Sequence, residues 1–439
     1  MNTAEDRQTN STANTGMPLV LRAREPDREV RAFLRSLNLL SRARSADNHS
    51  LSQLPRLRQV WRLAALALGR RPQLESVIER EIDGPAGPIA LRIFTPARSE
   101  QALPAFLWCH GGGFIIGGLD TGDSICRSIA LATGCITVAV RYRLAPEHDL
   151  TAGREDFLAA LEWLAHNGAE LGIDTSRLAI GGDSAGGNIA AAVAQENLRR
   201  GGPQLCMQVL AYPATDLVHA FPSLAENAEG YLVTARLLEQ MKQTVAGSVG
   251  PLDAEDPWLS PRRRTDLRGL PPAVVISAGF DPIRDDGLDY AVRLRAAGVP
   301  VEILHYAGQI HGFLNFDEVF GGGRDALQRA ADALARVFRL EPARNLTIEI
   351  ADEAPQAQSS LLAAANEVAT STLTTWVATE RWSNTLLCLL SPKAATVCKF
   401  LLKPWSIPVA LVRGKIIAHL DRLDAHQTYP TLKDCSVEH

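Results

Sequence analysis

The most restrictive feature of this sequence lies at residues 178–194, where a short apolar run, a Gly-x-Ser-x-Gly pentad and an alanine-rich segment follow one another. In that order they are typical of a buried strand, a sharp turn and a helix, which would hold the Ser184 hydroxyl at the carboxyl end of the strand. Gly182 and Gly186 leave the space that such a turn needs. The pentad alone also fits an ordinary glycine turn, so its interpretation as a nucleophile turn depends on the rest of the chain.

A second glycine-rich turn, with the sequence His-Gly-Gly-Gly-Phe, occupies residues 110–114 directly after the apolar run 105–109. Three consecutive glycines let backbone N–H groups approach a ligand closely, as an oxyanion hole requires. The alternative is a phosphate-binding loop, but the Lys-Ser/Thr pair of that motif is absent from this stretch. We expect His110 to brace the turn rather than to react.

The order of strand-like and helix-like segments predicts the fold class. They alternate between residues 105 and 340, which indicates an α/β protein with a mostly parallel sheet and helices on both faces. Two earlier strand-like runs, 75–82 and 89–94, flank a turn and predict an antiparallel start to the sheet. The alternation breaks at residues 214–260, where a helical segment lies among Pro, Gly and acidic residues. We interpret this insertion, together with residues 18–72, as a helical cap.

Charge and composition exclude several classes of function. The net charge of −4 and the pI of about 6.2 give no basic field for nucleic acid. No run of eighteen apolar residues occurs, so we expect no membrane span. The polar N-terminus contains no apolar signal-peptide core. The seven cysteines are odd in number and form no C-x-x-C pair, which favours a reduced, cytoplasmic location.

Four stretches in this order complete a recognisable pattern: His110-Gly-Gly-Gly-Phe, Gly182-Asp-Ser-Ala-Gly-Gly-Asn, Asp281-Pro-Ile-Arg-Asp-Asp-Gly and His311-Gly-Phe. Together they make residues 18–341 resemble the hormone-sensitive-lipase-like carboxylesterases of the α/β-hydrolase superfamily. The resemblance implies an α/β-hydrolase fold with a helical cap and a catalytic triad of Ser184, Asp281 and His311. It also implies an oxyanion hole formed by the N–H groups of Gly112, Gly113 and Ala185, and ester hydrolysis without a cofactor or metal ion.

The resemblance also divides the chain into three parts. Residues 1–17 are rich in Thr, Asn and Ser and are expected to form a disordered tail. Residues 18–341 form the expected catalytic domain, with its cap at 18–72 and 214–260. Residues 342–439 are a C-terminal extension of unknown role. Its short apolar runs fit either a partly disordered tail or a segment that docks on the domain or on a partner.

Three acidic residues that are close in sequence are candidates for the carboxylate that binds His311: Asp281, Asp285 and Asp286. Asp281 follows one strand-like run, and His311 follows the next one along the chain, residues 301–306. Parallel neighbouring strands present their carboxyl ends at the same edge of a sheet, which favours Asp281. Asp285 and Asp286 belong to the first turn of the intervening helix, where acidic side chains complement the helix dipole. N-capping of that helix is the alternative role of Asp281.

The resemblance implies a small-molecule ester as the substrate. Because the expected cap takes up space over the serine and the side chains beside the motifs are bulky, we expect acyl chains of short to medium length, about C2 to C8. Hydrolysis of an amide, lactone or carbamate on the same triad is the alternative reaction. A non-catalytic ligand-binding member of the fold, which would lack the triad histidine, is disfavoured because His311 is present.

Two further expectations concern surfaces. Apolar residues beside the motifs are candidates for a substrate pocket, although each fits the protein core equally well; they are Phe114, Ile115, Leu217, Ile310 and Phe313. The strand-like run from Val301 to Tyr306 is the last one before the closing helix. It would therefore lie at the edge of the sheet, where it would allow a homodimer to form through that edge.

Overall fold

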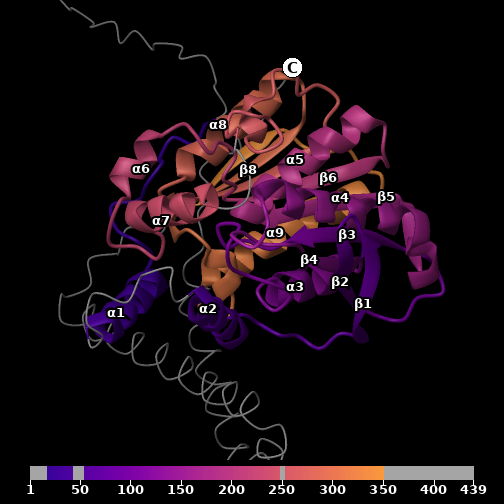
Figure 1. Cartoon of the computed structure of the whole chain (residues 1–439), viewed down its shortest axis with the longest axis horizontal. Coiled ribbons are helices and arrows are strands. Elements are labelled where there is room, and N and C mark those ends of the chain that lie inside the picture. The colour runs from indigo at the N-terminus through magenta and orange to yellow at the C-terminus, as the bar shows by residue number, and fades with distance from the viewer. Residues whose placement is uncertain (1–16, 43–53, 248–252, 351–439) are drawn as a thin grey trace, which may run out of the picture.

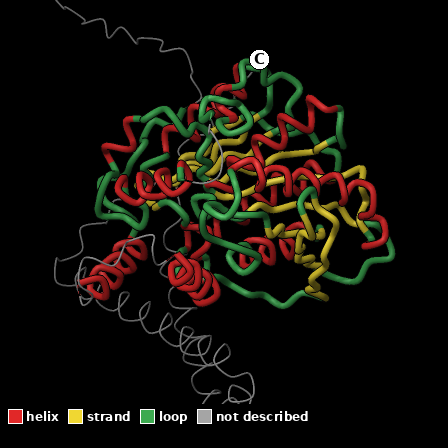
Figure 2. Tube along the Cα trace, viewed as in Figure 1, coloured by secondary structure: helices red, strands yellow, loops and turns green. Residues whose placement is uncertain are grey.

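The computed structural model describes residues 17–42, 54–247 and 253–350. Figures 1 and 2 show a sheet at its centre. The strand order of this sheet is β1-β2-β4-β3-β5-β6-β7-β8-β9. The β1–β2 and β2–β4 pairs are antiparallel, and the other neighbouring pairs are parallel. A mostly parallel sheet with an antiparallel start is therefore confirmed. The strands are β1 (Ser76–Gly84), β2 (Gly87–Thr95), β3 (Leu103–Cys109), β4 (Ile136–Arg141), β5 (Ile173–Asp183), β6 (Leu205–Ala211), β7 (Ala273–Phe280), β8 (Val301–Ile310) and β9 (Leu346–Ile350).

Helices cover both faces of the sheet, because its inner strands are apolar on both sides. All residues of β7 and β8 are buried, as expected for parallel strands between two helical layers. One apolar cluster joins the sheet to helices α4 (Leu150–Asn167), α5 (Ala185–Arg200) and α8 (Arg284–Ala296). A second cluster joins the opposite face to α3 (Asp123–Thr133) and α9 (Gly321–Phe338).

Four further helices come from the two segments that the sequence assigns to the cap. They are α1 (Arg28–Arg42), α2 (Leu54–Leu68), α6 (Pro222–Glu226) and α7 (Ala235–Ala246). Figure 1 shows the four on the same side of the molecule, with the indigo helices from the N-terminal segment below α6 and α7. Two segments that are far apart in the sequence therefore contribute to one end of the fold.

The prediction that residues 301–306 form an edge strand is wrong, because β8, which contains them, is not at an edge of the sheet. Five residues of β9 pair in parallel with β8, from Glu302 opposite Leu346 to Tyr306 opposite Ile350. The run Val301 to Tyr306 thus has a strand on each side, and its backbone groups are not available for a strand-mediated dimer. The domain boundary at residue 341 also lies too early, since the sheet continues to Ile350.

β9 is held by side chains as well as by the sheet. The Glu349 carboxylate accepts hydrogen bonds from the backbone N–H groups of Leu19 and Val20, at 2.9 and 2.8 Å. Arg295, near the end of α8, donates to the Leu346 carbonyl and to the Thr347 hydroxyl. The first and last described segments of the chain are therefore tied together beside β8.

Candidate functional site

Ser184 lies on the sharp turn between β5 and α5 that the sequence predicts. Its backbone has φ 56° and ψ −119°, an unfavourable conformation for a residue with a side chain. A Cβ atom on Gly182 would lie 2.3 Å from the Gly186 carbonyl oxygen, and one on Gly186 would lie 2.1 Å from the Cys109 carbonyl oxygen. Both positions therefore require glycine, and the two glycines permit the close crossing of β3 and the turn.

The structure brings Ser184, His311 and Asp281 together. Asp281 follows β7 and His311 follows β8, and these two strands are parallel neighbours. The distance from His311 Nδ1 to Asp281 Oδ2 is 2.8 Å, and the distance from His311 Nε2 to Ser184 Oγ is also 2.8 Å. An ionised carboxylate can only accept, so Nδ1 donates to Asp281 and Nε2 accepts from the serine hydroxyl. This is the tautomer in which an imidazole can take the proton of Ser184.

Asp281 also caps the turn that follows it, since its Oδ1 accepts a hydrogen bond from the Ile283 N–H at 2.9 Å. Its side chain is completely buried, and His311 is 7% exposed. The two roles considered for Asp281 are therefore compatible: one carboxylate oxygen faces His311 and the other faces the backbone of the turn.

Asp285 and Asp286 bind the cap instead of His311. The Asp285 carboxylate accepts from the backbone N–H of Ser223, in the first turn of α6, at 2.8 Å. Asp286 accepts from the N–H groups of Thr215 and Asp216, at 2.7 and 3.1 Å, and from the Thr215 hydroxyl. Burial raises the pKa of Asp286 to about 7. Their expected role as simple partners of the helix dipole is thus incomplete, because both fix the start of the 214–260 segment.

The glycine loop has the backbone conformation that its composition suggests. Gly112 has φ 127° and Gly113 has φ 59°, a region of φ that favours glycine. The Gly112 carbonyl accepts from the N–H groups of Ile115 and Ile116, at 3.1 and 3.0 Å. A Cβ atom on Gly112 would lie 2.2 Å from the Ile116 carbonyl oxygen, so a side chain at this position would force the turn open.

His110 braces this loop. Its Nδ1 lies 2.9 Å from the Gly111 carbonyl oxygen, to which it donates, and its ring stacks on Tyr142 with ring centroids 4.3 Å apart. The Tyr142 hydroxyl donates to the His110 carbonyl at 2.9 Å. Burial lowers the pKa of His110 to about 4, so the imidazole is neutral near pH 7. The side chain is therefore suited to supporting the loop and not to exchanging protons at neutral pH.

The predicted pocket residues have different environments. Ile115, Ile310 and Phe313 have no exposed surface and belong to the two core clusters, so in this conformation they serve as core. Phe114 is 8% exposed beneath the Arg154 guanidinium, which lies 5.2 Å from the ring centroid. Leu217 is half-buried at the edge of one cluster. Of the five, Phe114 and Leu217 thus retain some surface that could meet a substrate.

Sequence reasoning missed Met241, on cap helix α7. A Cβ atom on Gly113 would lie 2.3 Å from Met241 Sδ, so this side chain packs directly on the glycine loop. Beside His311, Leu232 is the nearest neighbour of a Cβ atom on Gly312, at 4.0 Å. A helical pattern alone gives no sign of such contacts, because they depend on how the cap lies over the sheet.

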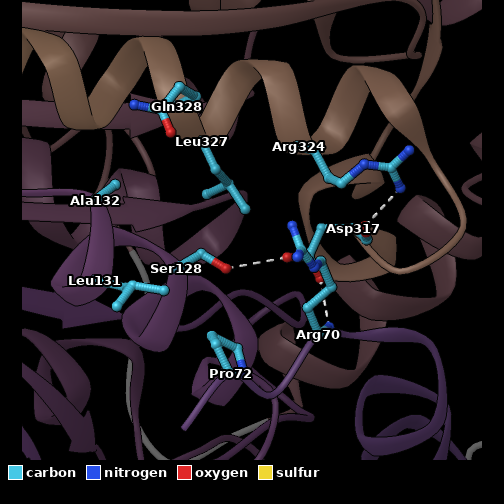
Figure 3. A pocket seen from close by; sticks show the side chains of 9 residues that line it. All are labelled: Arg70, Pro72, Ser128, Leu131, Ala132, Asp317, Arg324, Leu327 and Gln328. Carbon is cyan, nitrogen blue, oxygen red and sulfur yellow. Dashed lines mark hydrogen bonds between the residues drawn. The ribbon is translucent and has the colours of Figure 1, made fainter. Parts of the chain in front are cut away.

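A separate pocket of about 220 Å³ lies between α3 and α9 (Figure 3). Its buried Asp317 accepts from the Arg70 N–H at 2.7 Å and from the Ser128 hydroxyl at 3.1 Å, and the Arg324 guanidinium donates to its carbonyl. Neither the triad nor the glycine loop contributes to the lining. Within residues 17–42, 54–247 and 253–350, no group of three or more His, Cys, Asp or Glu side chains is placed to hold a metal ion.

Comparisons with known proteins identify the fold and the family. A sequence model of the α/β-hydrolase fold matches residues 106–315. The chain is 42% identical over 269 residues to "Esterase LipI" of Mycobacterium tuberculosis, which covers 61% of this chain and 83% of that protein. It is 33% identical over 310 residues to "Ethyl acetate hydrolase" of Pseudomonas putida, covering 68% and 96%.

Solved structures give the same result. A hyperthermophilic esterase from the archaeon Pyrobaculum calidifontis superposes with a TM-score of 0.65 at 36% identity, covering 69% of this chain and 96% of that one. A thermostable esterase from Pseudomonas putida superposes with a TM-score of 0.66 at 30% identity, covering 73% and 99%. Because the sheet, the serine turn and the relatives all agree, the chain belongs to the hormone-sensitive-lipase-like carboxylesterases of the α/β-hydrolase fold.

Proposed function

We propose that Ser184, His311 and Asp281 are the catalytic triad of this carboxylic ester hydrolase. Ser184 Oγ attacks the ester carbonyl carbon while His311 Nε2 takes the serine proton. The same imidazole then returns the proton to the leaving alkoxide, and a water molecule, activated in the same way, releases the acid from the acyl-enzyme. Asp281 holds the Nδ1–H tautomer and stabilises the imidazolium. The observation that carries the proposal is the pair of 2.8 Å contacts on the two nitrogens of one imidazole.

The backbone N–H groups of Gly112, Gly113 and Ala185 are the proposed oxyanion hole. Ala185 is the first residue of α5, so its N–H is not used within the helix and lies at the positive end of the helix dipole. The positive φ values of the two glycines support a loop shaped by its backbone alone. By analogy with measured single donors, each N–H would stabilise the tetrahedral intermediate by about 3 kcal/mol.

The triad is tested by substitution with matched controls. Ser184→Ala should lower kcat by at least about 10⁴-fold and abolish labelling by a fluorophosphonate. Asp281→Asn should lower kcat by roughly 10⁴-fold, because the amide favours the wrong imidazole tautomer. Asp285→Asn and Asp286→Asn are the controls and should each cost less than about tenfold. Labelling of the Ser184 variant, or equal damage at either control in a protein that melts cooperatively, would contradict the assignment.

We also propose a preference for esters with short to medium acyl chains, about C2 to C8. Met241 supports this, because a donor such as the Gly113 N–H lies about 3 Å from the carbonyl oxygen it binds, and Met241 packs on that glycine. The cap side chain therefore meets the first few carbons of the substrate. A series of p-nitrophenyl esters measures the preference, and faster turnover of emulsified triolein than of p-nitrophenyl butyrate would contradict it.

Hydrolysis of amides, lactones or carbamates is the alternative use of the same triad. Its discrimination requires p-nitroanilides and lactones assayed beside the matching esters. The relatives named esterase and ethyl acetate hydrolase favour the ester. A kcat/KM for an anilide above that of the corresponding ester would favour the alternative instead.

The proposed location is the cytoplasm. In the described part of the chain, none of the helices is long and apolar enough to cross a membrane. The proposal is supported by the free thiols of Cys109, Cys126, Cys135 and Cys206, since a reducing compartment keeps thiols free. Fractionation of the native cells, followed by an activity assay, tests it.

A further inference from the structure

We infer that Asp183, the residue before the nucleophile, is a positioning residue. It fixes the glycine loop at residues 110–114, here called the oxyanion loop, and the segment at residues 311–316, here called the histidine loop, relative to Ser184. The inference rests on the function proposed above. Asp183 is the last residue of β5 and is 5% exposed. Its carboxylate lies between the glycine loop and the segment after His311, and it reaches both.

The first contact is with the oxyanion loop. Asp183 Oδ1 accepts a hydrogen bond from the Gly111 N–H at 2.8 Å. A Cβ atom on Gly111 would lie 2.5 Å from Asp183 Oδ2, so the loop backbone rests directly on the carboxylate. Gly111, Gly112 and Gly113 have no side chains through which the protein could hold them. A charge-assisted bond from the neighbouring strand therefore fixes the start of the loop whose N–H groups must be placed before the oxyanion forms.

The second contact is with the histidine loop. Asp183 Oδ2 accepts from Asn315 Nδ2 at 3.1 Å, and both side chains are buried. Asn315 lies in a short helical turn, η4 (Phe313–Phe316), and its N–H donates to the Gly312 carbonyl at 3.0 Å. Since Gly312 follows His311 directly, this chain of bonds leads from Asp183 to the general base.

The two contacts make one carboxylate the link between three catalytic loops. Ser184 is joined to it by the peptide bond, the oxyanion loop by Gly111 and the His311 loop by Asn315. Each contact uses a different oxygen, so both oxygens are needed. Burial raises the pKa of Asp183 above its ordinary value, and its two donors and the nearby His311 limit that increase. The hydrogen-bonding pattern requires acceptors at both oxygens, which the ionised form supplies.

An exchange of the two partners tests the inference. Asp183→Ala removes both bonds and should lower kcat for p-nitrophenyl butyrate by about 100-fold with KM changed less than about threefold. Asn315→Asp places two buried carboxylates against each other and should lower kcat by a similar factor of about 100. In the double variant Asp183→Asn, Asn315→Asp, the amide oxygen can accept from Gly111 and the amide nitrogen can donate to the new carboxylate. This variant should recover at least about tenfold over Asn315→Asp.

Asp317→Asn is the matched control, because Asp317 is a buried carboxylate two residues after Asn315. Its side chain accepts hydrogen bonds from Ser124 and Ser128 and not from the oxyanion or histidine loop. It should lower the melting temperature and leave kcat within about threefold. Asp183 would have no positioning role if Asp183→Ala kept kcat within threefold, or if the exchange gave no recovery in a cooperatively melting protein.

Ser184→Ala, tested in parallel with a fluorophosphonate, distinguishes failure of the proposed triad from failure of the positioning role of Asp183. If that variant still reacts and turns over ester, the proposed function fails. If it is inactive while the exchange gives no recovery, the triad stands and the positioning role of Asp183 fails. Loss of kcat that simply follows the melting temperature across the four variants, Asp317→Asn included, would also overturn the inference.

Discussion

Removal of β9 should destabilise the catalytic domain by an amount that the structure allows us to estimate. The perturbation is a comparison between a chain ending at Arg344 and one ending at Ile350, which differ only in the residues around this strand. Five residue pairs join β9 to β8, and Ile350 is 2% exposed. With roughly three ladder hydrogen bonds of about 1 kcal/mol each and about 2 kcal/mol for the buried Ile350, the cost is on the order of 5 kcal/mol.

That free energy corresponds to a measurable change in melting temperature. At an unfolding entropy of about 2.1 cal/mol/K per residue over roughly 330 residues, 5 kcal/mol lowers Tm by about 7 °C. Scanning calorimetry of the two chains measures the difference. Loss of β9 also leaves the backbone groups of β8 unpaired, so the shorter chain should associate at high concentration, which light scattering would detect.

Glu349→Gln in the full chain provides a milder control. It keeps the strand and removes only the charge that the Leu19 and Val20 N–H groups contact, so Tm should fall by no more than about 2 °C. If the chain ending at Arg344 melts within about 2 °C of the chain ending at Ile350, β9 contributes little and the reasoning is refuted.

Three further predictions concern the site and its cap. Gly112→Ala should lower kcat by at least about 100-fold while the protein stays folded, because a Cβ atom would push the Ile116 carbonyl and displace the N–H donors; an active variant in steady-state assays would contradict this. Met241→Ala should raise kcat/KM for decanoate over butyrate esters by about tenfold, whereas Lys242→Ala, an exposed neighbour on the same helix, should not change the ratio. Burial raises the folded-state pKa of Asp286 to about 7, so its contribution to the free energy of unfolding is complete below about pH 4 and is lost as pH rises through 7. Between pH 5 and 8, the free energy of unfolding measured in urea should therefore fall by about 3 kcal/mol less in Asp286→Asn than in the parent protein. If the free energy of unfolding depends on pH equally in both proteins, Asp286 is not the origin of the effect.

The sequence predicts the central part of the fold because local patterns determine it. The serine turn requires small residues where two backbone segments cross, and the glycines at positions 182 and 186 indicate this requirement in the sequence. The approach of Asp281 to His311 follows from two parallel strands that end at one edge. In both cases the constraint is local or follows from a general rule of chain topology, so no knowledge of side-chain packing is required.

The errors have a common physical origin in tertiary contacts. β9 is a short strand after a helix, and five residues of moderate β propensity gain stability only by pairing with β8. The edge position of Val301 to Tyr306 was inferred from the absence of a later strand-like run, and so it failed together with β9. The contact of Met241 with Gly113 depends on the position of the cap helix, which the sequence pattern of that helix does not encode.

The attachment of the cap limits how new substrate preferences can be acquired in this chain. The segment after β7 has two roles. Asp281 accepts a hydrogen bond from His311, and Asp285 and Asp286 bind the segment that begins at Thr215. The donors to these carboxylates are mainly backbone N–H groups, so a cap transplanted from a relative would have to bring its backbone along the same path to meet them. Recombination between relatives should therefore succeed more often when residues 214–260 and 281–286 are exchanged as one unit than when residues 214–260 are exchanged alone.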